Sequence, residues 1–270
     1  MRNNLPIVTF RTPPVVEVVC GVQFDPLPLS MAHLGLFWHQ LKSAFPSAQD
    51  AMPLLPVIES PQGTISQGGD ALEIQILPDS RRLMLTDAKR QHLIQIQNNR
   101  FHHNWRKQGE SDTYPRFHEV LSGFLGRWGE FESFLRDEEL PNPHIVQCEM
   151  TYVNHIMAGT VWSKELGIDA LFPWLGPRMR LKDDMPEIEC ALHFPMSESR
   201  GRLHATVKTG RRVSDKLPVV VLDLTVRGAL ESGQDHSALG EWFAVARECI
   251  IDAFVKLTGP KAHAAWGIET

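Results

Sequence analysis

Several features that would identify a common class of protein are missing from this sequence. Four cysteines lie far apart in apolar stretches and form no CxxC pair: Cys20, Cys148, Cys190 and Cys249. This spacing argues against a disulfide framework or a zinc knuckle and predicts buried thiols in a reducing compartment.

No stretch approaches the ~18 consecutive apolar residues of a membrane span. The N-terminal stretch MRNNLPIVTFRTPP also lacks the apolar core of a secretory signal. We therefore expect a cytoplasmic protein without a membrane partner.

An excess of basic charge is also absent. The chain has 27 Lys and Arg against 32 Asp and Glu, which gives a net charge of −5 and a pI near 6.2. The strongly basic footprint of a non-specific nucleic-acid binder is therefore missing, although local basic patches remain compatible with this balance. With 43% hydrophobic and 22% charged residues, the 270-residue chain has the composition of one large or two ordinary globular domains.

The sequence contains none of the common catalytic or cofactor-binding motifs. It has no GxxxxGK[ST] loop, no GxGxxG after a strand, no GxSxG elbow, and no HxH or HExxH among its twelve histidines. Glu187 and Glu189 share one face of a predicted strand, where two carboxylates can perform acid–base chemistry or hold a divalent ion. However, an acidic run that also contains Asp183 and Asp184 is more typical of a solvated edge. We expect no catalytic residues, metal or cofactor, so an enzyme is the less favoured class.

Hydrophobic periodicity divides the first half of the chain into strands and two helices. Apolar positions three and four residues apart predict helices at 30–45, with Ser30 as a cap, and at 115–136. Alternating or apolar runs predict strands at 15–24, 71–77, 81–87 and 92–101, the last extending toward Trp105. The connections between the last three strands are too short for crossovers, which predicts an antiparallel meander.

The second half shows the same order of elements. Strands are predicted at 145–157, 187–194, 202–209 and 218–228, a short helix at 162–172, and a long helix at 236–258 capped by Asp235 or Ser237. We therefore expect an α+β fold in which residues 1–141 and 142–270 form one continuous pseudo-symmetric unit. Its curved antiparallel sheet would carry long helices on one face, as in helix-grip or TATA-binding-protein-like folds.

The densest polar cluster is QIQNNRFHHNWRK at 95–107, followed by YPRF at 114–117. Because alternate strand residues share a face, Phe101, His103 and Trp105 should point into the core. The opposite row is polar and partly cationic: Arg100, His102, Asn104 and Arg106. A Trp and a Phe at this spacing are usually core residues and an exposed Arg is usually solvated, so a structural network is one interpretation. The density of guanidinium, amide and phenol groups favours recognition of an anion or a peptide as the other.

These motifs, with TYVNHI at 151–156, AHAAWG at 262–267 and PPVVEVVCGVQF near the N-terminus, resemble a sporadically distributed bacterial family of uncharacterised proteins. The resemblance covers essentially the whole chain, and NWRK and YPR are its most specific parts. Eight residues match the family's motif positions: Asn104, Trp105, Arg106, Tyr114, Pro115, Arg116, Tyr152 and Asn154. His102 and His103 depart from the apolar residues that the family prefers. The family's patchy distribution is similar to that of mobile or defence-linked genes, and the resemblance implies no established activity.

The most basic part of the chain is SRGRLHATVKTGRRV, residues 199–213. Arg202, Lys208, Arg211 and Arg212 are candidates for contact with nucleic-acid phosphates. The alternative is a charged hairpin that protects the edge of a sheet from aggregation.

Two hypotheses follow. The first is a non-catalytic recognition module or complex subunit that binds a protein partner, or alternatively nucleic acid, through the sheet face. Its candidate residues are Arg100, Tyr114, Arg116, Tyr152, Asn154 and the NWR part of NWRK. The second is a protein with a pocket between sheet and helices in which an Arg pair holds an anionic ligand. A cavity that contains both Arg106 and Tyr152 would favour the second hypothesis. A homodimer is compatible with either.

Overall fold

The computed structural model describes residues 8–55, 57–59, 81–159, 161–176, 187–196, 201–230 and 233–269. Nine strands in this part of the chain form one antiparallel sheet in the order β3-β4-β5-β6-β2-β7-β10-β9-β8. They are β2 (Val15–Phe24), β3 (Ser47–Ala51), β4 (Arg82–Thr86), β5 (His92–Gln97), β6 (Arg100–Arg106), β7 (Ile145–Met157), β8 (Glu189–Pro195), β9 (Arg202–Arg211) and β10 (Pro218–Gly228). The predicted α+β class with an antiparallel sheet is confirmed.

The two central strands join the N-terminal and C-terminal parts of the chain. β2 pairs with β7 over nearly its whole length, and Val18 lies opposite Tyr152. On the outer sides, β2 pairs with β6 and β7 pairs with β10. A separate two-stranded sheet pairs β1 (Thr9–Phe10) with β11 (Ile268–Glu269), which brings segments near the two ends of the chain together.

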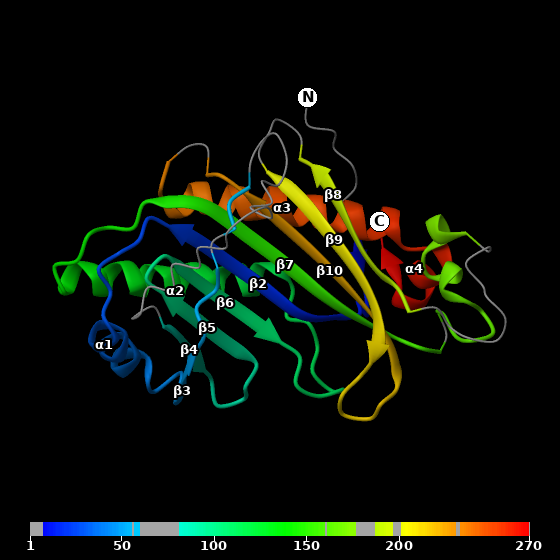
Figure 1. The fold of residues 1–270 in the computed structure, drawn as a ribbon, viewed down its shortest axis with the longest axis horizontal. Coiled ribbons are helices and arrows are strands. Elements are labelled where there is room, and N and C mark those ends of the chain that lie inside the picture. The colour runs from blue at the N-terminus through cyan, green and yellow to red at the C-terminus, as the bar shows by residue number, and fades with distance from the viewer. Residues whose placement is uncertain are drawn as a thin grey trace, which may run out of the picture.

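Two long helices lie on the same side of the nine-stranded sheet, behind it in Figure 1. They are α2 (Phe117–Asp137) and α3 (His236–Leu257); α1 (Met31–Leu41) and α4 (Pro260–Trp266) are shorter. Two predicted caps are present, because Ser30 accepts the amide of His33 and Asp235 accepts the amide of Ala238. No helix in the described part of the chain combines the length and apolar character needed to cross a membrane.

Two sequence-based predictions of secondary structure were wrong. The strand expected from 92 to 101 or beyond is a hairpin, in which Gln97 faces Arg100 across a two-residue turn at Asn98 and Asn99. Asparagine is favoured in turns because its short side chain can hydrogen-bond to nearby backbone groups. The helix expected at 162–172 contains only the short 3-10 turn η1 (Ile168–Ala170), followed by η2 (Pro173–Leu175). The strand expected at 71–77 lies outside the described residues.

The physical reason for the missing helix is local. Gly167 has a φ of 77°, in the left-handed region that a continuing helix excludes. Pro173 follows closely and cannot donate a helical hydrogen bond. Trp162 and Phe172 are both fully buried, so apolar packing instead of helical hydrogen bonding fixes this connection.

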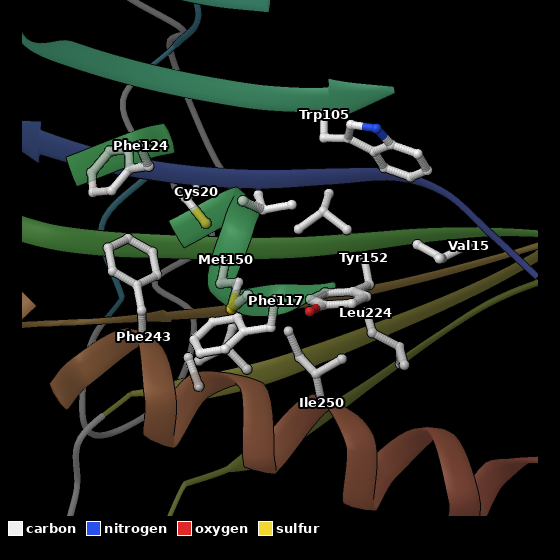
Figure 2. Packing of buried hydrophobic residues seen from close by; sticks show 14 of the residues in the cluster. Val15, Cys20, Trp105, Phe117, Phe124, Met150, Tyr152, Leu224, Phe243 and Ile250 are labelled. Carbon is white, nitrogen blue, oxygen red and sulfur yellow. The ribbon is translucent and has the colours of Figure 1, made fainter. Parts of the chain in front are cut away.

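The core fills the space between the sheet and helices α2 and α3. Figure 2 shows side chains from adjacent strands, among them Cys20, Met150 and Leu224, pointing toward Phe243 and Ile250 of α3. Aromatic rings make up much of this layer; Phe124 of α2 and Phe243 of α3 pack edge-on, with ring centroids 5.0 Å apart.

The predicted burial of the thiols is confirmed for Cys20 and Cys148, and burial raises the pKa of both above the ordinary range. Cys190 and Cys249 are half-buried.

Candidate functional site

The face of the sheet turned away from α2 and α3, here called the polar face, carries the polar row of the opening motif. Within β6, Phe101 and Trp105 point toward the helices and are 0% and 2% exposed. Arg100 and Asn104 point the other way, as the alternation predicted, yet they are only 7% and 3% exposed. A row expected to face water or a ligand is therefore largely covered.

Hydrogen bonds to neighbouring strands fix this row. Arg100 donates from Nη2 to Oε1 of Gln23 at 2.6 Å. Asn104 accepts from Gln95 at 3.0 Å and donates to the Glu17 carboxylate at 2.6 Å. Because a charged guanidinium and a carboxylate are engaged, these contacts are stronger than neutral hydrogen bonds and hold the side chains in fixed positions.

His102 occupies the middle of the polar face and requires a glycine beside it. A Cβ atom at Gly21, its neighbour on β2, would lie 2.2 Å from the His102 ring, so only glycine fits there. Burial lowers the pKa of His102 to about 4; the Glu149 carboxylate opposes this shift, and the guanidinium of Arg100 acts in the same direction as burial. The ring is therefore neutral at physiological pH.

The neighbouring His103 lies on the helix side of β6. Its ring stacks on His92 with centroids 5.3 Å apart and fits against Gly123 of α2. Burial lowers the pKa of His103 to about 3. The two adjacent histidines point to opposite faces, which rules them out as joint ligands of one metal. Within the described residues, no group of three or more His, Cys, Asp or Glu side chains is placed to hold a metal ion.

Two carboxylates complete the polar face on the β7–β10 side. Arg227 of β10 forms a salt bridge from Nε to Glu149 of β7. Burial raises the pKa of Glu149, but the charge that His102 gains at acidic pH and the guanidinium of Arg227 outweigh this effect, so the pKa lies below its ordinary value. Glu59, whose side chain is 3% exposed, contacts Nε2 of His204 at 2.6 Å and lies 3.9 Å from Nη1 of Arg227.

Glu59 belongs to an extended segment, described at residues 52–55 and 57–59 and here called the strap. In Figure 1 it runs in light blue across the front of the sheet, on the side away from α2 and α3. The Gln97 side chain accepts from the amide of Leu54 at 2.9 Å and donates to its carbonyl at 3.1 Å. The Gln147 side chain accepts from the amide of Glu59 at 2.9 Å and donates to the Val57 carbonyl at 2.7 Å. Arg100 also donates to the carbonyl of Leu55 at 3.2 Å.

The aromatic and tyrosine members of the predicted site lie in the core, on the helix face. Trp105 packs against Tyr114 with ring centroids 5.5 Å apart, and the hydroxyls of Tyr114 and Tyr152 are 2.8 Å apart. Figure 2 shows Trp105 and Tyr152 among the buried apolar residues. Burial raises the pKa of Tyr114 to about 12 and that of Tyr152 well above its usual value, so both phenols remain neutral. Asn154 is also buried there and donates to the Leu222 carbonyl at 3.1 Å.

Tyr152 and Asn154 lie on the opposite face of the sheet from Arg106, and not beside its row. Arg116 donates to the Phe10 carbonyl at 2.8 Å and so ties the start of α2 to β1. Nε of Arg106 is buried and has no hydrogen-bond partner among the described residues.

Carboxylates neutralise much of the basic hairpin. Lys208 contacts Glu189 at 2.6 Å, and Arg212 contacts Asp215 and, at 3.0 Å, Glu110. Arg211 donates to the Lys216 carbonyl at 3.0 Å. Arg202 is half-buried and lies opposite Arg227 in the β9–β10 ladder. The paired cations are poorly placed for counterion release on a phosphate backbone.

Sequence reasoning missed most of the residues that build the polar face: Glu59, Gln97, Gln147, Glu149, His204 and Arg227. A signal for some of them was present. In β7, Gln147, Glu149 and Thr151 alternate with buried residues, and in β10 Thr225 and Arg227 do the same. Polar residues at every second position of two central strands indicate a shared face.

The fold and the polar face together define an α+β protein with a long antiparallel sheet. Helices α2 and α3 cover one side of this sheet, and the strap crosses its polar side. No protein-family model matches the chain, and no curated protein matches it in sequence.

Proposed function

We propose that this protein is a non-catalytic recognition module that binds a protein partner through the polar face of its sheet. One observation carries the proposal: the polar face already holds an extended piece of polypeptide, described at residues 52–55 and 57–59, through the side-chain amides of Gln97 and Gln147. A carboxamide presents one donor and one acceptor side by side, as a peptide group does, so it can bind a backbone without regard to sequence. The density of such groups supports recognition better than catalysis.

Charge favours a protein partner over nucleic acid. The chain carries a net charge of −5, and the polar face mixes Arg100 and Arg227 with Glu17 and Glu149. Mixed charge gives specificity for a surface of complementary pattern, whereas a phosphate backbone requires one sign. We retain from the family resemblance a bacterial, cytoplasmic setting for this partner, and a second copy of the chain is one candidate for it.

The alternative of a pocket between sheet and helices receives less support. Arg106 and Tyr152 lie on opposite faces, so a single pocket lined by both would have to pass through the sheet. The space between sheet and helices is occupied by packed apolar side chains.

The order of strands supports a further proposal, that the fold consists of two related halves of the helix-grip type. β4, β5, β6 and β2 lie side by side from the outer part of the sheet toward its centre, and β8, β9, β10 and β7 follow the same order inward from the other edge. α2 follows β6 in the chain, and α3 follows β10. If this is right, the polar face spans both halves, as it would in a module that binds an elongated partner.

Affinity capture from the native host tests the proposed function. Arg106→Ala should reduce the amount of captured partner about tenfold, since a lost charge-assisted contact removes roughly 1.5–3 kcal/mol of binding. The matched control is Arg136→Ala at the exposed end of α2, which should retain the partner.

Mass spectrometry would identify the captured material with and without nuclease, and thermal melts would show that both variants are folded. Equal capture by Arg106→Ala and the parent would contradict the proposal. Capture that nuclease abolishes would assign the polar face to nucleic acid instead.

A further inference from the structure

The strap is attached to the polar face in the manner of a bound peptide. Its contacts come from three strands of the sheet: Leu54 bonds to Gln97 of β5, Leu55 to Arg100 of β6, and Val57 to Gln147 of β7, which lies beyond β2. Each of these bonds uses main-chain groups of the strap and side chains of the sheet. These side chains therefore bind the backbone of an extended chain and do not depend on which residues that chain contains.

One strap side chain is recognised specifically. Glu59 is buried, with Oε1 2.6 Å from Nε2 of His204 and 3.9 Å from Nη1 of Arg227. The other oxygen, Oε2, is buried without a hydrogen-bond partner among the described residues. His204 also contacts Nδ1 of His193 through its own Nδ1 at 2.7 Å, on the side of the ring away from Glu59, so one imidazole and one guanidinium face this carboxylate.

Most of the large apolar side chains of the strap point away from the sheet. Met52, Leu55 and Ile58 are 75%, 59% and 63% exposed, whereas Pro53 and Leu54 are half-buried. A segment that served only to cover the sheet would gain most by burying all of these side chains. Instead the sheet beneath the strap is polar, and hydrogen bonds and one carboxylate make up its specific contacts, which a competing chain can replace.

We propose that the strap is an internal ligand of the polar face, and that the partner presents an extended peptide of the same chemistry. Such a peptide would supply its backbone to Gln97 and Gln147 and an acidic side chain to His204 and Arg227. This inference rests on the proposed function and names the class of ligand that the face takes. The partner peptide then binds by displacing the strap.

A synthetic peptide tests the inference directly. In the opened variant, residues 52–59 are replaced by a Gly-Ser segment of the same length, which keeps the chain connected but removes Glu59 and the apolar residues. The probe is a fluorescent peptide with the sequence of residues 51–60, AMPLLPVIES. The opened variant should bind it at least about tenfold more tightly than the parent, whose face is occupied.

Two changes identify the contacts. A peptide with Gln in place of the glutamate at position 59 should bind the opened variant about tenfold more weakly. Adding Gln147→Ala to the opened variant should weaken binding similarly, whereas Gln40→Ala, on exposed α1, should not. If the opened variant fails to fold, Glu59→Gln in the intact chain serves instead, and it should bind the unmodified peptide more tightly than the parent does.

Absence of peptide binding by a folded opened variant, or by Glu59→Gln when that variant is used, would overturn the inference. That result would leave the Arg106-dependent capture of a partner intact. Conversely, a peptide that binds as expected, beside a partner captured equally by Arg106→Ala, would refute the proposed function but keep the strap as an internal ligand.

Discussion

Lowering the pH from 7 to 5 is expected to destabilise the protein by roughly 4 kcal/mol, because two buried histidines must stay neutral in the folded state. His102 and His103 are 5% and 2% exposed, and burial lowers their pKa values to about 4 and about 3. In the unfolded chain both return to a pKa near 6.5. Each histidine contributes about 2 kcal/mol to the loss in the free energy of unfolding at pH 5, because its ring binds a proton in the unfolded state but stays neutral in the folded state.

The sign and the pH window follow from these values. Stability is fully present above about pH 6.5 and falls as the pH drops below it. The contribution of His102 continues to fall to about pH 4 and that of His103 to about pH 3. Glu149, whose pKa is lowered, adds its own loss only at more acidic pH, so it does not interfere between pH 7 and 5.

Denaturant melts at several pH values would measure this loss. His102→Gln combined with His103→Gln should remove the larger part of the dependence between pH 7 and 5, and a smaller part should remain from histidines such as His92 and His155, whose pKa burial also lowers. His39→Gln, at an exposed position of α1, should leave the dependence unchanged. A parent protein equally stable at both pH values would show that the two rings are not buried and neutral.

Replacing Arg227 with Met should destabilise the protein by about 3–5 kcal/mol, because it leaves a carboxylate in the interior without its cation. The Glu149 side chain is 18% exposed and loses its salt bridge, and Glu59 loses a second nearby positive charge. Adding Glu149→Met should recover part of the loss, since replacing both members of a buried pair by apolar groups is often close to neutral.

Lys208→Met provides the matched control. It breaks another salt bridge on the same sheet, at 2.6 Å to Glu189, but there the side chains are 53% and 73% exposed. Such an exposed pair contributes little to stability, because water and salt screen it. Chemical melts of the variants give the comparison, and equal losses for Arg227→Met and Lys208→Met would refute the buried network of the polar face.

Strand positions could be predicted well from the sequence wherever apolar and polar residues alternate. β2, β7 and β10 begin and end where the pattern places them, at Val15–Phe24, Ile145–Met157 and Pro218–Gly228. The hairpin at Asn98 and Asn99 was missed because QIQNNRF continues the alternation on both sides of the turn. A two-residue turn leaves almost no polar interruption for a pattern to detect.

The site could be predicted only in part, for reasons of register and long-range contact. Alternation correctly separated Arg100 and Asn104 from Phe101 and Trp105. Alternation within β7 could not show on which face of the sheet Tyr152 lies relative to β6. That depends on how β6 and β7 each pair with β2, in which Val18 lies opposite Trp105 on one side and Tyr152 on the other. Nor could it foresee the strap, whose bond between Glu59 and Gln147 joins residues 88 positions apart.

Amide hydrogen exchange on the strap shows whether the polar face is a binding surface from which a peptide can be displaced. We expect the amides of Leu54 and Glu59 to exchange through local opening, at least ~100-fold faster than hydrogen-bonded amides of the central strands β2 and β7. Gln147→Ala should speed exchange at Glu59 further and leave β2 unchanged. Strap amides that exchange only as slowly as those of β2 and β7 would mean that the strap leaves the sheet only on global unfolding, and would contradict the account.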